Sequence, residues 1–127
     1  MFLDFSGVYE PETVPEGEVQ LRVLNVEIKT QKPEKGSGEF IQARFDIPNA
    51  PKSKDVTHVM MLPTEQDDPK KRNGRLAAIQ NFIKACGMEN INNVDELIGC
   101  TCWAILGEEE STEFGKQNRI KKFVVGR

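Results

Sequence analysis

Histidine and cysteine, which most often serve as general base, nucleophile or zinc ligand, are scarce in this chain. His58 is the only histidine, and it lies in a strand-like stretch, where a single histidine usually packs or faces solvent. Nucleophilic catalysis needs such a histidine beside an activated nucleophile, and nothing nearby supplies one. Cys86 and the pair Cys100-x-Cys102 lack the paired spacing of zinc sites, so we expect thiols that line a core. The sequence therefore predicts a protein that is not an enzyme and holds no metal or cofactor.

Cations and aromatic rings occur in a pattern suited to binding. Single-stranded nucleic acid is held by cations along its phosphates and by aromatic faces that stack on bases, at ~1–3 kcal/mol per base. Any single lysine is as easily explained by solvent exposure as by nucleic-acid binding, and Trp103 is as easily explained by core packing. The prediction of nucleic-acid binding therefore depends on all of these residues together. The candidate contact residues are Arg22, Lys32, Lys35, Phe40, Arg44, Trp103, Phe114, Lys116, Arg119, Lys121 and Lys122.

The stretch Glu18–Thr30 has a strand pattern whose phase changes. Val19, Leu21 and Val23 alternate with polar residues, and the apolar positions then continue as Leu24, Val26 and Ile28. A shift by one residue turns side chains to the other face, so a straight strand does not bury both sets. We expect a β-bulge near Val23–Leu24 that bends the strand between two walls of one core.

The remaining pattern predicts a mainly β protein. Clean alternation in FIQARFDI buries Ile41, Ala43, Phe45 and Ile47 and leaves Phe40 on the polar face. The other expected elements are a strand at 56–62, a helix from Pro69 ended by Gly87, a short turn at 94–98, a strand at 100–106, an acidic loop at 107–117 and a strand at 119–125. Five strands with a helix between the third and fourth indicate a Greek-key OB-fold barrel, whose second and third strands and flanking loops bind oligomers.

Composition restricts the class of protein. The chain has 127 residues, a length typical of one domain, and a net charge of −3. We expect residues 1–16 to form an arm packed on a domain at 17–127. No apolar run is long enough for a membrane span, and the first residues lack a secretory signal. Three cysteines without such a signal suggest reduced thiols in a cytoplasm.

Several segments together resemble a known family. They are DFSGVYEPETVPEGEVQLRVLNVEIK, RLAAIQNFIKACG, VDELIGCTCWAIL and NRIKKFVV. In this order they are similar to bacteriophage single-stranded-DNA-binding proteins of the OB-fold type. The resemblance implies a non-catalytic protein that coats and protects single-stranded DNA during phage replication, recombination or repair in the cytoplasm of an infected bacterium. It also implies contacts through Arg119, Lys121, Lys122, Phe40 and Trp103, a monomer or homodimer, and replication or recombination proteins as further partners.

An alternative function uses the acidic segments. Glu10–Glu18 and Glu108–Glu113 are rich in carboxylates, and they suit the interface of an OB-fold adaptor that binds a host or phage protein and no nucleic acid. The sequence alone leaves both hypotheses open.

Overall fold

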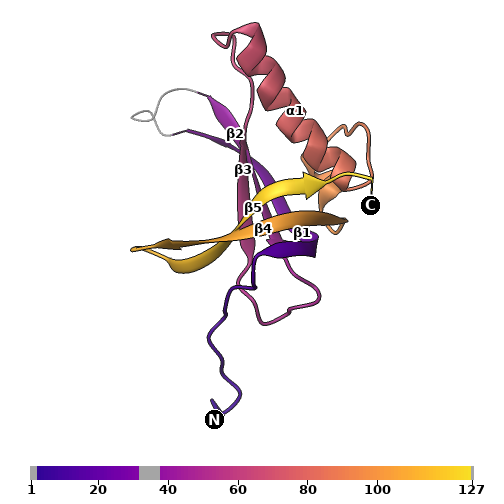
Figure 1. Cartoon of the computed structure of the whole chain (residues 1–127). Helices are drawn as coiled ribbons and strands as arrows, with labels where there is room; N and C mark the ends of the chain where they lie inside the picture. Colours follow the sequence, from indigo (N-terminus) through magenta and orange to yellow (C-terminus); the bar gives the residue numbers. More distant parts are fainter. Residues whose placement is uncertain (1–2, 32–37, 127) are drawn as a thin grey trace.

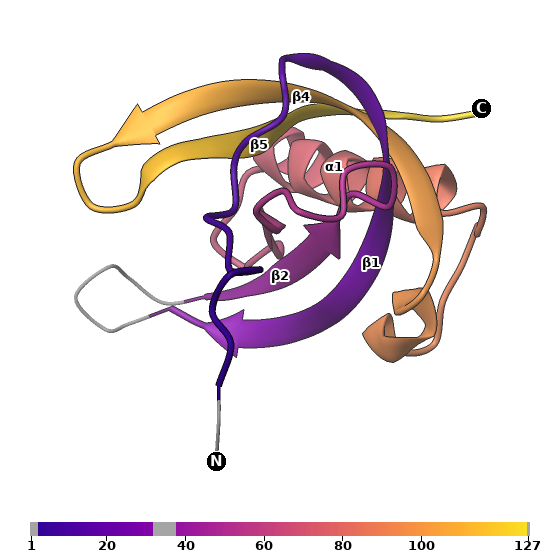
Figure 2. The same cartoon turned by 90° about the horizontal axis from the view of Figure 1, so that it is seen from below.

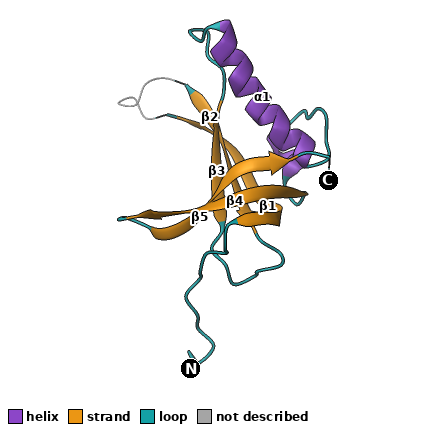
Figure 3. Ribbon diagram, in the orientation of Figure 1, coloured by secondary structure: helices purple, strands orange, loops and turns teal. Residues whose placement is uncertain are grey.

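The computed structural model describes residues 3–31 and 38–126. Five strands form one antiparallel sheet in the order β3-β2-β1-β4-β5, and one α-helix, α1 (Pro69–Ala85), connects β3 toward β4 (Figures 1 and 3). The strands are β1 (Gly17–Thr30), β2 (Glu39–Asp46), β3 (Val56–Met61), β4 (Thr101–Ser111) and β5 (Gly115–Val124). A 3₁₀ turn at Val94–Leu97 precedes β4. The predicted mainly β architecture, with its helix between the third and fourth strands, is confirmed.

Strand β1 contains the expected bulge. Val23 pairs with Phe45 and Asn25 pairs with Arg44, so Leu24 is the extra residue on β1. Residues 17–22 pair with β4 and residues 25–30 pair with β2, while Arg22 and Val23, just before the bulge, pair with β2 as well. The strand therefore joins two halves of the sheet, β1–β4–β5 and β1–β2–β3, and the sheet curls around the core (Figure 2). The prediction that the apolar face continues to Ile28 is wrong, since Ile28 is 49% exposed near the end of the strand.

The acidic segment between β4 and β5 is not the loop that its composition suggested. β4 continues to Ser111 and β5 begins at Gly115, so most of residues 107–117 form a hairpin. Opposite charges face each other across it, because Glu110 pairs with Lys116 and Glu109 lies 3.8 Å from the Arg119 guanidinium. Such cross-strand pairs offset the low strand propensity of charged residues.

Helix α1 starts and ends at local signals in its sequence. The Asp68 carboxylate accepts a hydrogen bond from the Lys71 amide (2.7 Å), and Pro69 occupies the first turn. At the other end Gly87 adopts φ +82°, a left-handed conformation that glycine reaches without strain. No helix among the described ranges is long and apolar enough to cross a membrane.

One aromatic cluster attaches α1 to the sheet. Phe82 is the buried residue of α1, and its ring centroid lies 5.1 Å from Phe123 on β5 and 5.7 Å from Phe45 on β2. His58 on β3 contacts the Phe123 ring edge-on at 5.3 Å. The cluster thus connects the two outermost strands, β3 and β5, with the helix that lies across one end of the curled sheet (Figure 2).

The N-terminal segment is attached to the domain at its base. Buried Asn118 donates to the carbonyls of Val14 (2.9 Å) and Gly107 (3.1 Å) and accepts from the Val14 amide (2.9 Å). The Lys54 amide donates to the Glu12 carbonyl at 2.9 Å. Residues 3–9, by contrast, extend away from the sheet (Figure 1) and carry exposed apolar side chains.

We predict that Phe82→Ala lowers the free energy of unfolding by about 3–5 kcal/mol, the usual cost of removing a buried aromatic ring. The ring's contacts with Phe45 and Phe123 are lost together, so helix and sheet should remain one cooperative unit of lower stability. Urea unfolding followed by far-ultraviolet circular dichroism measures the change. Phe5→Ala is the matched control, because the Phe5 side chain is 69% exposed. Equal midpoints for the two variants would contradict the prediction.

Candidate nucleic-acid interface

The outer face of β1–β2–β3 brings an aromatic ring, cations and apolar side chains together. Lys29 on β1 lies opposite Phe40 on β2, and Phe40 lies opposite Met61 on β3, so the three residues form one row across the strands. The next rows along the same face are Glu27–Gln42–Val59 and Asn25–Arg44–Thr57. We call the residues of these three rows the platform. Phe40 is half-buried there, on the opposite side of β2 from the buried Ile41, as the alternation predicted.

The charges of the platform are partly neutralised. Lys29 lies 3.6 Å from the Glu27 carboxylate, and Arg44 lies 3.9 Å from the Asp55 carboxylate. These groups are about half exposed, so each pair stabilises the fold by only ~0–1 kcal/mol and is easily exchanged for a phosphate. A depression of about 190 Å³ lies among Asn25, Glu27, Lys29, Gln42 and Arg44.

Arg22 is engaged at the edge of this face. Its guanidinium makes a two-pronged ion pair with Asp46, in which Nε donates to one carboxylate oxygen at 3.1 Å. The hydrogen bond to Asp46 raises the pKa of Arg22 further, so it remains a cation at all accessible pH values. The pair fixes both side chains, and Arg22 is a weaker candidate for a phosphate contact than Arg44.

The cations of β5 also face acids. Arg119 pairs with Glu109, and Lys121 lies 3.6 Å from the Glu16 carboxylate at the base of the N-terminal arm. Lys121 is the extra residue of a second bulge, and its aliphatic stem covers Gly107. Lys122, opposite Ile105, has no carboxylate partner within the described part of the chain. Of the four candidate cations on this strand, Arg119 and Lys121 are therefore paired with acids.

The three candidate aromatic residues do not share one surface. Phe40 pairs with the second half of β1, at Lys29, whereas Trp103 pairs with Gln20 in the first half. Trp103 lies half-buried on the outer side of β4, on the face opposite the buried Cys102 and Ala104, so it is not a core residue. Phe114 is 60% exposed at the tip of the β4–β5 hairpin. The bend of β1 therefore places Phe40 and Trp103, which the sequence-based prediction assigned to one binding surface, on different halves of the sheet.

Two predicted loop contacts, Lys32 and Lys35, lie outside the described residues. Lys116, expected in a loop, lies on β5, and its carbonyl accepts a hydrogen bond from the Lys54 ammonium at 2.7 Å.

Helix α1 adds cations that the sequence-based site did not include. It carries Lys70, Lys71, Arg72, Arg75 and Lys84 and no acidic residue. Its first turn follows the segment after β3, where the Leu62 amide donates to Glu39 and the Arg75 guanidinium donates to the Leu62 carbonyl (3.4 Å). Arg75 also pairs with Asp67, whose pKa is lowered mainly by the Thr64 amide. This basic helix begins next to the Phe40 end of the platform. The run KKRNGR shows the cations in the sequence, but only the structure shows their position beside Phe40.

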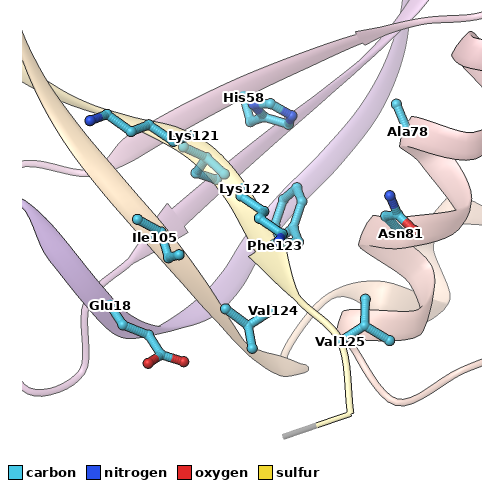
Figure 4. Close-up of a pocket in the computed structure, with 11 residues that line it drawn as sticks. Glu18, His58, Ala78, Asn81, Ile105, Lys121, Lys122, Phe123, Val124 and Val125 are labelled. Carbon is cyan, nitrogen blue, oxygen red and sulfur yellow. The ribbon is translucent and has the colours of Figure 1, made fainter.

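A hollow of about 860 Å³ opens between β3, β5 and α1 (Figure 4). His58 and Phe123 lie side by side in it, Ala78 and Asn81 face them from α1, and Lys122 also lines it. Its other lining residues are Glu18, Ile105, Ile120, Lys121, Val124 and Val125. We call this feature the seam hollow, because it lies where the outermost strands of the sheet approach each other.

The thiols meet at the junction of α1 and β4. Cys86 caps the helix, and Cys102 is buried on the inner face of β4, as expected of thiols that line a core. A hydrogen bond to Cys102, together with burial, raises the pKa of Cys86, and burial raises that of Cys100. Among the described residues no group of three or more His, Cys, Asp or Glu side chains is placed to hold a metal ion.

Comparison with known proteins adds no assignment: no protein-family model matches the chain, and no curated protein is significantly similar to it. The platform and the seam hollow are therefore judged on their own chemistry.

We predict that the free energy of unfolding decreases as the pH is lowered through the range in which His58 titrates. Burial against Phe123 lowers the pKa of His58 below its usual value near 6.5. The unfolded chain therefore takes up a proton below about pH 6.5 that the folded chain resists, so the stability is complete above that pH and declines below it. Urea midpoints between pH 8 and pH 5 measure the effect.

His58→Phe keeps a ring against Phe123 and removes the titrating group, so its midpoint should vary less between pH 7 and pH 5. The carboxylate of Asp67 contributes at lower pH, because its pKa is lowered from an ordinary value near 4. An identical pH profile for the wild type and this variant would show that His58 is not responsible.

Proposed function

We propose that this protein binds single-stranded DNA without sequence preference, using the platform as its main contact surface. The observation that carries the proposal is the row Lys29–Phe40–Met61, in which a half-buried ring lies beside a cation on an open strand face. A base stacked on Phe40 leaves its phosphate within reach of Lys29, and Arg44 lies on the same face for the neighbouring nucleotide. This is the combination of stacking and backbone neutralisation that single-strand binding requires.

The arrangement of strands supports an OB-type barrel as the scaffold. The strand order, the bulge that divides β1, and the helix between β3 and β4 all agree with that fold. The contact of His58 with Phe123 brings the outermost strands near each other on the remaining side. In such a barrel the face of the second and third strands is the binding surface, and here that face contains Phe40, Arg44, Val59 and Met61.

The flanking elements suit an extended ligand. The end of β1, the start of β2 and the tip of the β4–β5 hairpin project toward the same side of the molecule in both views (Figures 1 and 2). The basic start of α1 lies near the Phe40 end of the platform. A single strand that follows these elements meets cations at one end and the exposed ring of Phe114 at the other, in line with a role in coating DNA during phage replication, recombination or repair.

We expect tight binding of a fluorescent oligo-dT of ~30 nucleotides, longer than the ~4–16 nucleotides that one OB domain covers. The matching duplex should bind weakly. A log–log plot of affinity against salt should fall with a slope of about −0.7 for each phosphate neutralised. Absence of single-strand binding at low salt would contradict the proposal.

Phe40→Ala should weaken binding by about 1–3 kcal/mol, which is the loss of one stacked base. Trp103→Ala is the matched control, because it removes another half-buried ring from an outer strand face, on the other half of the sheet. Urea unfolding of both variants separates loss of affinity from loss of folding. A larger effect for Trp103→Ala would place the interface on β1–β4–β5 instead of on the platform.

A further inference from the structure

The inner face of β3 carries a polar side chain where the strand pattern calls for an apolar one. Strand alternation sets Val56, His58 and Met60 on this face, and Val56 and Met60 are buried in the core. His58 lies between them and is only partly buried, because it lines the seam hollow. A polar residue at such a position breaks the pattern that specifies the fold, and positions of this kind are candidates for function.

Helix α1 presents a second polar side chain to the same space. Asn81 directly precedes Phe82, the buried residue of the helix, and it faces His58 and Phe123 across the hollow (Figure 4). Within the described chain, neither the His58 imidazole nor the Asn81 amide is hydrogen-bonded to another residue. Each group has at least one donor and one acceptor, which therefore stay available to a ligand in the hollow.

The hollow also has a cation that is not held by an acid. Lys121 is paired with Glu16, and Glu18, the one carboxylate among the described lining residues, already makes an interaction of its own. Lys122 lines the hollow and has no carboxylate partner among the described residues. A negatively charged group on a ligand would form a charge-assisted contact with it.

The rest of the lining is mainly apolar. Ile105 and Val125 are exposed there and Val124 is half-buried, next to the ring of Phe123. The volume of about 860 Å³ falls within the ~300–1,000 Å³ that is usual for small-molecule sites. Such sites combine an apolar lining with a few polar groups that fix the orientation of the ligand, and the hollow has both.

We propose that the seam hollow binds one nucleotide. The flat face of the base packs on the His58 ring, the polar edge of the base meets the Asn81 amide, and the phosphate pairs with Lys122. A nucleotide meets these requirements together, because its base has apolar faces and adjacent donors and acceptors on its edge, and its phosphate is an anion. A free nucleotide and the terminal nucleotide of a DNA strand share this chemistry.

The site is separate from the platform. The platform residues of β3 are Thr57, Val59 and Met61, which lie on the outer face of the strand, whereas His58 lies on the inner face. Nucleotide binding in the hollow therefore does not rest on DNA binding by the platform. Phe40→Ala should leave it unchanged, so the failure of one proposal is distinguishable from the failure of the other.

Titration of the ¹⁵N-labelled protein with dTMP at low salt, followed by ¹H–¹⁵N correlation NMR, tests the proposal. We expect saturable changes in the side-chain amide signals of Asn81 and in the backbone signals around His58 and Lys122. The nucleotide should bind about 10-fold more tightly than thymidine or inorganic phosphate, because each of these lacks one of the parts that the hollow contacts.

Two substitutions test the polar contacts. Asn81→Ala and Lys122→Ala should each weaken dTMP binding by about 3–10-fold, the usual effect of losing one hydrogen bond or ion pair to a ligand. Asn73→Ala and Lys84→Ala are the matched controls, because both residues are exposed on α1 and neither lines the hollow. Asn81 and Lys122 are exposed as well, and far-ultraviolet circular dichroism checks that all four variants fold.

A short oligo-dT distinguishes the two sources of the nucleotide once dTMP binding is established. Changes in the same signals of the hollow would identify the end of a DNA strand as the ligand. Changes in the platform signals alone would identify a free nucleotide. Both results are consistent with a nucleotide site.

Three results would overturn the proposal. The first is the absence of a saturable change at any dTMP concentration that the protein tolerates. The second is a set of changes centred on Phe40, or lost in Phe40→Ala, which would place the nucleotide on the platform. The third is equal binding of dTMP by the Asn81→Ala, Lys122→Ala and control variants.

Discussion

The packing of Phe82 against Phe45 and Phe123 is the constraint on which the rest of the molecule depends. The side chain of Phe82 is the buried anchor of α1, and its two partners come from strands in different halves of the sheet. His58 extends the cluster to β3, so the outermost strands are joined through rings. This contact sets the position of the helix against the sheet, and with it the wall that α1 gives to the seam hollow.

Positive and negative charges are distributed unevenly over the surface of the protein. On β5 the cations are largely matched by acids of β4 and of the arm, which stabilises the hairpin and leaves little net charge for a ligand. On α1 and the platform the balance is more positive, since α1 has no acidic residue and the ion pairs of the platform are loose. A chain with a net charge of −3 in this way includes a helix with five cations and no acid without being basic overall.

Much of the backbone could be predicted because its signals are local. The phase change at Val23–Leu24, the alternation of β2 and the stop at Gly87 each follow from neighbouring residues. The hairpin at 107–117 could not be predicted, because its charged residues have low strand propensity and are stabilised only by partners on the other strand. The separation of Phe40 from Trp103 likewise depends on which half of β1 each neighbouring strand joins. The proposed contact role of either ring stays a prediction.

The bulge at Leu24 has a mechanical consequence. The sheet has two three-stranded halves that share only β1, and β1 bends between them at the bulge of Leu24. On the opposite side the two halves meet through the contact of His58 with Phe123. In the described residues no backbone hydrogen-bond ladder joins β3 and β5. Because few backbone hydrogen bonds hold that side together, we expect the two halves to separate there at a lower free-energy cost than neighbouring strands separate within either half.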